Sequence, residues 1–347
     1  MGPEARVVIV NWNGKAYLRN CLRTVLDQSY ERAGVIVVDN GSTDGSADLI
    51  RQEFPEVELL PLPQNLHFAR GTNAGVDLAL RDPACRYVVT LNNDTTVDRD
   101  FLAELVRAAA SDHVGMVSAK LLFMDRPGVL NTTGMMPTRD GTGLDRGWNQ
   151  RDEGQFDAAM EVFAPSAGAA LYRREVFETV GLFDEDFVAY CEDLDLAWRA
   201  RLAGWEARFA PRAVVHHKYS ASTAYQSSWK TYQGERNRIW TLVQNYPWRY
   251  VALGVPWNAT RVLAQVRRHA ARRLLRPGTA APSAGPPGPG FTGFVDATLR
   301  ARLDAYAGMG RALQKRRLRS RYRTVEAAEV GRWLRRFGMG IPNTLMD

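Results

Sequence analysis

Leu91-Asn92-Asn93-Asp94-Thr95-Thr96-Val97-Asp98, residues 91–98, is the stretch that decides the fold class of this 347-residue chain. It follows an apolar run, Tyr87-Val88-Val89-Thr90-Leu91, which predicts a buried strand. The strand then places the Asp94 carboxylate at its carboxyl end, the edge where ligands bind in an open α/β sheet. Mg²⁺ typically takes one or two carboxylates and completes its shell with water and substrate phosphates. The alternative is a plain strand-to-helix turn, with Asp98 or Asp100 capping a helix over about 99–110.

The first half of the chain alternates apolar β-branched runs with amphipathic stretches. This rhythm predicts an α/β fold with a mostly parallel sheet and helices on both faces. Residues 120–165 lack this alternation and predict long loops with short strands. A loop region this long inside a compact domain is usually functional. The expected strands lie at 7–10, 35–38, 57–60, 87–91 and 114–118, and the expected helices near 16–26, 44–52, 70–80, 99–110, 173–180 and 192–203.

Charge divides the chain into two regions. Residues 1–220 carry 23 Lys/Arg and 32 Asp/Glu, a net of −9, whereas residues 221–347 carry 22 and 6, a net of +16. This split indicates an acidic catalytic body and a basic tail that meets an anionic surface, with a membrane, nucleic acid or the acidic body as candidates. The expected organisation is a catalytic domain (1–220), a helical extension (221–275), a Pro/Gly linker (276–292) and a basic C-terminal helical segment (293–347).

The tail favours a membrane surface over nucleic acid, because it lacks a recognisable nucleic-acid-binding module. Residues 261–276 combine an apolar helical face with arginines, and residues 311–323 add further cations, a pattern typical of interfacial helices. A solvated basic helix, or one docked on the acidic body or in an oligomer interface, is the alternative. We expect neither a spanning helix nor a signal peptide. Three widely spaced cysteines, Cys21, Cys85 and Cys191, suit a reducing compartment.

Polar clusters follow several of the predicted strands. In Asp39-Asn40-Gly41-Ser42-Thr43-Asp44, Asp39 has the chemistry to accept hydrogen bonds from a base or ribose, although a plain turn uses the same residues. In Asn65–Gly75, small residues admit a ligand and Arg70 suits a phosphate, although a Gly-rich helix start is the alternative. The chain has no GxGxxG motif at this position, which argues against a dinucleotide site.

A second acidic cluster lies at Cys191-Glu192-Asp193-Leu194-Asp195. Acids in the first helical turn stabilise the helix dipole, and Asp195 also pairs with Arg199 at i,i+4. Crowding of the acids at 192 and 193 raises one pKa, which suits a general base. His217 ends another apolar run and either completes a metal site or is structural.

Taken in order, these segments resemble the inverting glycosyltransferases of family 2, which have the Rossmann-like GT-A fold. The motifs are VVIVNWNG, VVDNGSTDGS, NLHFARGTNAG, LNNDTTVD, GLFDEDFVAYCEDLDLAWR and VVHHKYSAS, over roughly residues 4–245. The chain looks most like the bacterial branch with rhamnosyltransferases and galactofuranosyltransferases of cell-surface polysaccharides. Asn92 stands where the family has the first acid of its metal motif, His67 where that branch often has Gly, and Tyr219 where Gly is usual.

The resemblance implies a role for each matching position. Asp193, with Glu192, would be the catalytic pair, with Asp193 as base. Asp94 and His217 would hold Mg²⁺ or Mn²⁺. The donor nucleotide would be bound by residues from four segments: Asn11, Asp39, Asn40, Arg70, Asn73, Asn92 and Asn93.

The implied activity is that of an inverting, metal-dependent hexosyltransferase. The donor would be a dTDP-rhamnose-like or UDP-linked sugar, and the acceptor a hydroxyl of a cell-surface glycan or lipid-linked molecule. The protein would lie on the cytoplasmic face of the cell membrane, with a homo-oligomer possible. The alternatives are a catalytically weak, nucleotide-sugar-binding or assembly subunit and, third, a nucleotidyltransferase, for which VVIVNWNGK is a poor match.

Overall fold

The structure, a computed structural model, describes residues 4–219, 227–254, 257 and 291–338. The chain forms two compact units. The first comprises residues 1–136, 145–219 and 322–325, and the second comprises residues 137–144, 220–321 and 326–347. Each unit is described by itself below.

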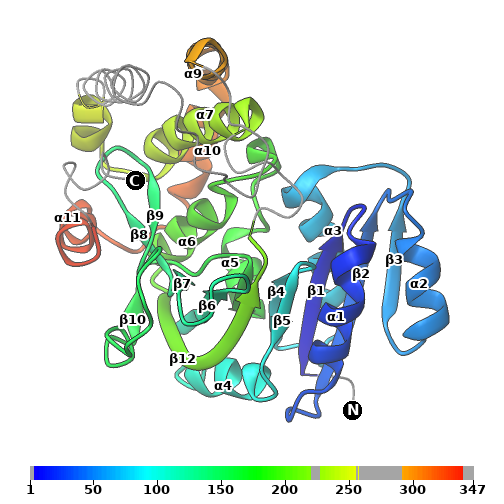
Figure 1. Ribbon diagram of the computed structural model, residues 1–347. Coiled ribbons are helices and arrows are strands. Elements are labelled where there is room, and N and C mark those ends of the chain that lie inside the picture. The colour runs from blue at the N-terminus through cyan, green and yellow to red at the C-terminus, as the bar shows by residue number, and fades with distance from the viewer. Residues whose placement is uncertain (1–3, 220–226, 255–256, 258–290, 339–347) are drawn as a thin grey trace. The chain divides into compact units, whose positions relative to one another are not determined.

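A ten-stranded sheet organises the first unit (Figure 1). Along its main path the strand order is β10-β12-β6-β11-β4-β1-β2-β3, while β5 pairs with β12 and β7 with β6. The run β3-β2-β1-β4 is parallel, β12 is parallel to β6, and β11 is antiparallel to both β4 and β6. The strands are β1 (Ala5–Asn11), β2 (Ala33–Asn40), β3 (Glu58–Leu62), β4 (Tyr87–Asn92), β5 (Thr95–Val97), β6 (Val114–Phe123), β7 (Leu130–Thr132), β10 (Glu161–Val162), β11 (Ala169–Arg173) and β12 (Glu206–His217), and a separate pair is β8 (Met135–Pro137) with β9 (Gly143–Asp145).

Helices cover both faces of this sheet because its central strands are apolar on both sides. On one face, Val7 and Ile9 share a buried cluster with residues of α1 (Lys15–Leu26), α2 (Ser46–Glu53) and α4 (Phe101–Ala108). On the other, α3 (His67–Leu80) comes so close that a Cβ on Gly75 would lie 2.4 Å from Val8. Further helices are α5 (Arg174–Val180), the 3₁₀ turn η1 (Glu185–Phe187) and α6 (Glu192–Leu202).

The predicted α/β class is confirmed, and the strands expected near residues 7, 35, 57, 87 and 114 all form. Two strands were not expected. β11 forms just before the helix expected at 173–180, and β5, only three residues long, follows the Asn-Asn-Asp turn where we expected the chain to run directly into a helix. A strand this short carries too little periodicity to be recognised. It has a large effect on the site, because its pairing with β12 determines what lies beside Asp94.

The second unit is helical among its described residues. It contains α7 (Ser228–Asn245), α9 (Phe291–Ala307), α10 (Met309–Arg319) and α11 (Ala327–Arg336). The predicted basic helical segment therefore forms three helices, α9, α10 and α11. Gly308 lies between the first two, and an added Cβ there would lie 2.5 Å from the side chain of Trp240. The expected boundaries at 221–275 and 276–292 fall largely outside the described residues, as does the proposed interfacial stretch 261–276, and they stay predictions. No helix in the described part of the chain is both long and apolar enough to cross a bilayer.

Candidate active site

The Asn-Asn-Asp turn meets the end of β12 through backbone pairing. In the antiparallel β5–β12 ladder, Thr95 lies opposite His217. The Asp94 carbonyl oxygen accepts a hydrogen bond from the Lys218 amide at 2.9 Å, which extends the pairing by one step. Consequently His217 Nε2 lies 3.3 Å from Asp94 Oδ1, and both side chains are buried. The two residues predicted to share a metal ion are neighbours.

The hydrogen bonds of His217 fix which ring nitrogen faces Asp94. Nδ1 lies 2.7 Å from Oδ1 of buried Asn131, an acceptor, so Nδ1 carries the hydrogen. In the neutral imidazole the Nε2 lone pair then faces the carboxylate of Asp94, with the amide nitrogen of Asn92 also 3.3 Å away. Two lone-pair donors that face each other need a proton or a cation between them.

This donor set fits a divalent cation of the Mg²⁺ or Mn²⁺ type. Such ions are held by few protein groups when substrate phosphates complete the shell, and a ligating His normally donates its other N–H to a buried acceptor, as His217 does. Within the residues that the structure describes, no group of three or more His, Cys, Asp or Glu side chains is placed to hold a metal ion. Of these residues, Asp94 and His217 would supply the protein's ligands, and a bound substrate would supply others.

A second group of polar side chains gathers where β1, β2 and β4 end. Asn11 lies opposite Asp39 in the parallel β1–β2 register. The Asn11 side chain accepts a 2.7 Å hydrogen bond from the Asn93 amide and donates to Ser42 Oγ at 3.2 Å. Gly14 is required there, because an added Cβ would lie 2.1 Å from the Asn93 amide nitrogen. Asn11, Asp39 and Asn93, predicted from separate motifs, thus lie at one sheet edge.

Asp39 is the group in this cluster that points to a ligand. Its side chain is 5% exposed, and Oδ1 is buried without a hydrogen-bond partner. An unsatisfied buried carboxylate oxygen is costly, so it normally marks a bound donor group. The predicted role, acceptance of hydrogen bonds from a base or ribose, supplies such donors.

Trp12 belongs to the same edge and was not identified from the sequence. It directly follows β1 and is 45% exposed, whereas an aromatic side chain of this size is usually mostly buried. An exposed indole at the end of β1, the strand that neighbours the one bearing Asp39, has the shape and chemistry to stack on a nucleobase. The position of this tryptophan in a strand-end loop was the signal available in the sequence.

Three residues predicted to bind the donor have their side chains engaged elsewhere. Asn40 donates to Asn65 and to the His67 carbonyl, and it accepts from the Leu66 amide, so it fixes the loop before α3. Asn73 exchanges hydrogen bonds with the Phe183 backbone. Arg70 is exposed and paired with Glu185 at 3.0 Å. These side chains shape the loops at residues 65–67 and 183–185.

Asp193 is the second residue of α6, and backbone amides hold its carboxylate. Oδ2 accepts from Ala167 N at 3.1 Å and Oδ1 from Leu194 N at 2.8 Å. Burial raises the pKa of Asp193, although these amides act to lower it. The side chain is only half-buried. A positioned, partly accessible carboxylate with a raised pKa has the properties of a general base.

Glu192 differs from its neighbour in burial. Its side chain is buried and Oε2 has no hydrogen-bond partner. Burial, followed by the charge of Asp193, raises the pKa of Glu192 well above its ordinary value. Burial therefore disfavours the charged form of Glu192 more strongly than that of Asp193. Asp195 has the structural role expected as the alternative, because it pairs with buried Arg199 at 2.9 Å.

One short segment connects the acidic pair with the Asn-Asn-Asp turn. Ala167 donates to Asp193, and the carbonyl of the next residue, Gly168, accepts from Asn92 N at 2.9 Å. A Cβ on Gly168 would lie 3.3 Å from the Asn92 side-chain amide, so a small residue is needed for this approach. Ala167 thus binds the candidate base, and the adjacent Gly168 binds the turn that carries the candidate cation site.

The backbone just before Asp193 is in an uncommon conformation. Val188, Tyr190 and Cys191 have φ angles of 66°, 68° and 68°. Positive φ is costly for residues with a Cβ, and most of all for β-branched valine. Strain of this kind concentrates at functional sites, where the surrounding structure maintains it. Here the Ala69 amide donates to the Val188 carbonyl at 3.1 Å.

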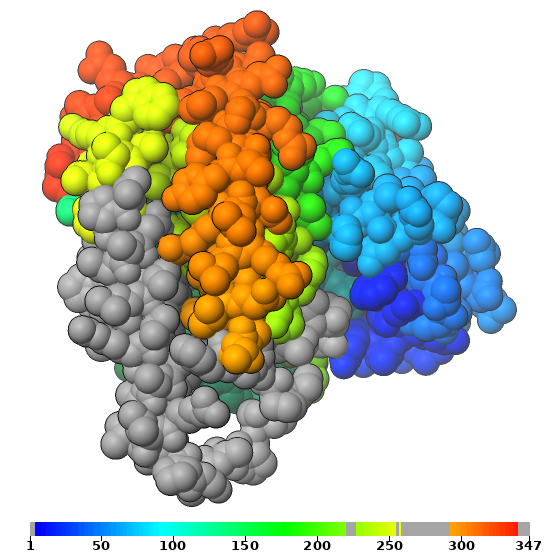
Figure 2. Space-filling model, turned by 90° about the horizontal axis from the view of Figure 1, so that it is seen from above, coloured from blue at the N-terminus to red at the C-terminus, as the bar shows by residue number. Residues whose placement is uncertain are grey.

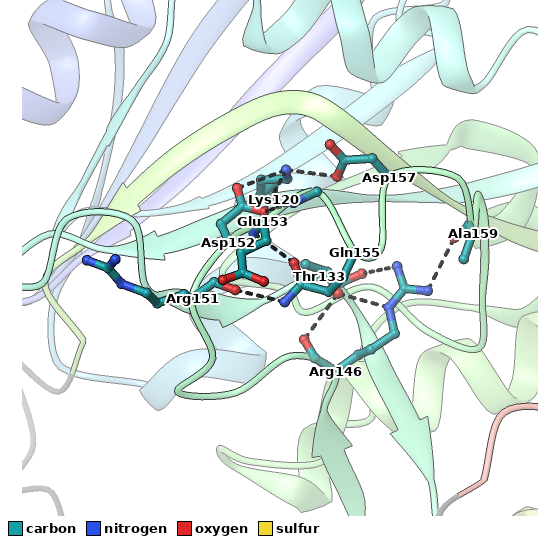
Figure 3. Close-up of polar contacts among 10 residues, drawn as sticks. Lys120, Thr133, Arg146, Arg151, Asp152, Glu153, Gln155, Asp157 and Ala159 are labelled. Carbon is teal, nitrogen blue, oxygen red and sulfur yellow. Dashed lines mark hydrogen bonds and ion pairs between the residues drawn. The ribbon is translucent and has the colours of Figure 1, made fainter.

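The loop at residues 146–159, within the region expected to be functional, is fastened at two points (Figure 3). Buried Lys120 on β6 binds Asp152 and Asp157 at 2.9 and 2.8 Å. Arg146 donates to Thr133 and to the Ala159 carbonyl. Its guanidinium also lies over the rings of Phe156 and Phe209, and burial lowers the pKa of Arg146 to about 10. The loop is therefore a defined part of the fold.

Comparisons with known proteins agree with this arrangement. The model of the family described as glycosyl transferase family 2 matches residues 6–181. An N-acetylglucosaminyl-diphospho-decaprenol L-rhamnosyltransferase of Mycobacterium tuberculosis is 29% identical over 231 residues, which are 61% of this chain and 75% of that protein. A poly-beta-1,6-N-acetyl-D-glucosamine synthase of Staphylococcus aureus is 25% identical over 206 residues, 58% of this chain and 47% of that protein.

Two solved structures share the fold. TarS of S. aureus, residues 1–349, superimposes with a TM-score of 0.50 at 15% identity, covering 93% of this chain and 91% of that one. GalNAc-T7, solved with UDP, GalNAc and Mn²⁺, gives a TM-score of 0.54 at 14% identity, covering 69% of this chain and 47% of that one. These likenesses concern the fold alone, and they confirm the GT-A architecture.

Proposed function

Because the chain belongs to glycosyl transferase family 2, we propose that it transfers a sugar, with inversion, from a nucleoside-diphosphate donor to a hydroxyl group of a glycan or lipid-linked acceptor. The observation that carries the proposal is the shared sheet edge of β1, β2 and β4. It holds an unsatisfied carboxylate, Asp39, and the Asp94 turn with its neighbouring His217. Asp193 is tied to the same turn through Ala167 and Gly168.

The donor is recognised by the groups at the ends of β1 and β2. Asp39 accepts hydrogen bonds from the base or ribose, and Trp12 stacks on the base. Asn11 and Asn93 lie beside them through their mutual hydrogen bond. Asn40 and Asn73 act by fixing neighbouring loops, and Arg70 remains exposed enough to meet a phosphate. Asn92 helps to orient His217.

Asp94 and His217 would hold a divalent cation, with Asn131 fixing the imidazole. Bound there, Mg²⁺ or Mn²⁺ would supply positive charge that stabilises the departing diphosphate. Because such ions need few protein ligands when substrate phosphates are present, one acid would be enough even with Asn92 in place of a second.

Asp193 acts as the base. It takes the proton from the acceptor hydroxyl, and that oxygen forms a bond to the anomeric carbon on the face opposite the nucleoside diphosphate. The bond between the anomeric carbon and the diphosphate oxygen breaks in the same displacement, so the configuration inverts. Neutral Glu192 keeps a second negative charge away from Asp193, which helps the base to stay ionised near neutral pH.

The substrates are proposed from the relatives. The mycobacterial relative is named for L-rhamnosyl transfer to a diphospho-decaprenol-linked sugar, so a dTDP-rhamnose-like donor and a lipid-linked acceptor of cell-wall synthesis come first, followed by UDP-sugars. Cys21, Cys85 and Cys191 form no disulfide, which suits a reducing compartment and hence the cytoplasmic side.

A donor panel tests this proposal. Full-length protein is mixed with dTDP- and UDP-sugars, Mn²⁺ and a short lipid-linked or glycan acceptor, and the release of nucleoside diphosphate is measured. The proton coupling at the anomeric carbon of the product reports inversion. We expect one donor to be preferred and Asp193→Asn to abolish acceptor-dependent release. Tight donor binding without transfer to any acceptor would instead favour a nucleotide-sugar-binding subunit.

A further inference from the structure

Helix α9 buries its small side chains and exposes its large apolar ones, which is the reverse of an ordinary surface helix. It buries small residues, Ala297, Ala301 and Ala305, and its contacts within the second unit are mainly with α7. Its large apolar side chains point away from that interface, since Leu299, Leu303 and Tyr306 are 57%, 69% and 59% exposed. A helix normally buries its large apolar side chains and exposes small or polar ones. The outer face of α9 therefore has the composition of a contact surface.

The three exposed residues form one stripe. Positions i, i+4 and i+7 of a helix lie on the same side, within about 60° of one another at 100° per residue. The buried alanines occupy the opposite side. In Figure 2 the atoms of α9, in orange, lie at the surface, and no described residue is drawn over them. We call Leu299, Leu303 and Tyr306 the outer stripe of α9.

The segment that carries the outer stripe is basic. Residues 291–321 carry eight Lys/Arg and two Asp/Glu. Some of the cations are internal, such as Arg316, which donates to the Val243 and Tyr246 carbonyls. The exposed ones include Arg300, Arg311, Arg317 and Arg321. The two acids are engaged locally, Asp296 with Arg300 and Asp304 with the Tyr232 hydroxyl.

We propose that the outer stripe of α9, with the exposed arginines of α9 and α10, is a docking surface for an anionic lipid bilayer. Leucine and tyrosine side chains partition into the region between headgroups and acyl chains, where tyrosine is especially favoured. The arginines remain at the level of the phosphates. The outer stripe was not part of the sequence-based membrane expectation, which rested on residues 261–276 and on the cations of 311–323, to which Arg311 and Arg317 belong.

Charge favours a bilayer over a second copy of the chain as the occupant. Two copies joined through this stripe would bring their arginine-rich helices together, and like charges repel. An anionic leaflet instead attracts every exposed cation of the surface at once. The stripe is also narrow, a single helix face, which suits shallow insertion better than a protein interface that needs about 800 Å² on each partner.

Vesicle co-sedimentation of the full-length protein tests the surface without any substrate, so its outcome does not depend on the proposed reaction. We expect binding to vesicles of phosphatidylcholine with phosphatidylglycerol and little binding to phosphatidylcholine alone. Leu299→Ser with Leu303→Ser should weaken binding by at least about tenfold, given the apolar area removed from the bilayer. Met160→Ser, an exposed apolar residue of the first unit, is the matched control and should bind like wild type.

Arg311→Gln with Arg317→Gln should weaken binding by roughly fivefold per charge and reduce its salt dependence. Circular dichroism of each variant checks that the helices remain folded. The proposal is overturned if wild type ignores anionic vesicles, or if the double serine variant binds them as wild type does. It is also overturned if light scattering shows a dimer that the serine variant dissociates, because the stripe then joins two copies.

Discussion

His217 Nε2 lies 3.3 Å from Asp94 Oδ1, while Asn131 binds the other nitrogen of the same imidazole at 2.7 Å. The contact exists because the three-residue strand β5 pairs with the last residues of β12. Two residues far apart in the sequence thereby form one candidate cation site, and a third side chain sets the tautomer. We therefore expect each of the three to have a separable effect on metal binding.

We expect Asp94→Ala or His217→Ala to remove most Mn²⁺ affinity and Asn131→Leu to reduce it by about 10–100-fold, the usual effect of losing the partner of a ligating histidine. Electron paramagnetic resonance of Mn²⁺ in the presence of nucleoside diphosphate measures binding directly. The matched control is Asp98→Ala, because exposed Asp98 contacts His216 at 3.4 Å on the same two strands. Unchanged Mn²⁺ binding in Asp94→Ala would remove this pair from the mechanism.

The acidic pair should respond differently to the loss of each charge. Asp193→Asn should lower turnover by about 10²–10⁴-fold, the usual contribution of a general base, with donor affinity kept. Glu192→Gln should retain activity within about tenfold, because a neutral glutamic acid and a glutamine have similar shape and hydrogen-bonding groups. Initial rates and donor titrations for both variants provide the check. If Glu192→Gln were the inactive variant, Glu192 would be the base.

Burial of Glu192 also predicts how stability depends on pH. Burial and then the charge of Asp193 raise the Glu192 pKa well above 4.5, so the folded protein binds more protons than the unfolded chain as pH rises past that value. The free energy of unfolding therefore falls with pH in that window, by about 1.4 kcal/mol for each unit of raised pKa. Glu192→Gln should lack this fall. Urea unfolding at pH 5 and pH 8 compares the two proteins, and equal pH dependence would place an ionised carboxylate at Glu192.

Most of the fold was predictable because its strands are apolar on both faces and its helices are amphipathic. The site was predictable where a polar residue directly follows such a strand, as Asp39 and Asp94 do. Asn131 was not predictable, since nothing in a Gly- and Thr-rich loop indicates that one amide will meet the ring of His217. That contact depends on the β6–β7 and β6–β12 pairings together.

The engaged side chains show a second limit of sequence reasoning. Asn40 and Asn73 occupy positions that suggest donor binding, yet their amides are satisfied by loop backbone in the structure. A motif fixes where a residue lies, but tertiary hydrogen bonds decide which of its atoms remain available. Glu192 and Asp193 are adjacent in sequence, and only burial distinguishes the neutral acid from the candidate base.

Lys120 should be needed for the loop at residues 146–159. Burial acts to lower its pKa, but the hydrogen bonds and charges of Asp157 and Asp152 outweigh burial and raise it. Lys120→Met would leave both carboxylates without their cation, so we expect a loss of about 1–3 kcal/mol in the free energy of unfolding. Arg51→Met, which breaks an exposed pair with Asp48, should cost less than about 1 kcal/mol. Equal losses would mean that Lys120 does not fasten the loop.

Trp12 should contribute to nucleotide affinity through its exposed ring. Stacking of a base on an aromatic side chain is worth about 1–3 kcal/mol by alanine substitution, so Trp12→Ala should weaken binding of UDP or dTDP by roughly 5- to 100-fold. Trp12→Phe should retain most of the affinity, because a phenyl ring still offers a stacking face.

Trp248→Ala, which removes an exposed tryptophan of the second unit, is the matched control. Calorimetric titration with each nucleotide gives the dissociation constants. A Trp12→Ala variant with wild-type affinity would show that the base does not rest on this ring, and Asp39 would then be the remaining candidate for base recognition.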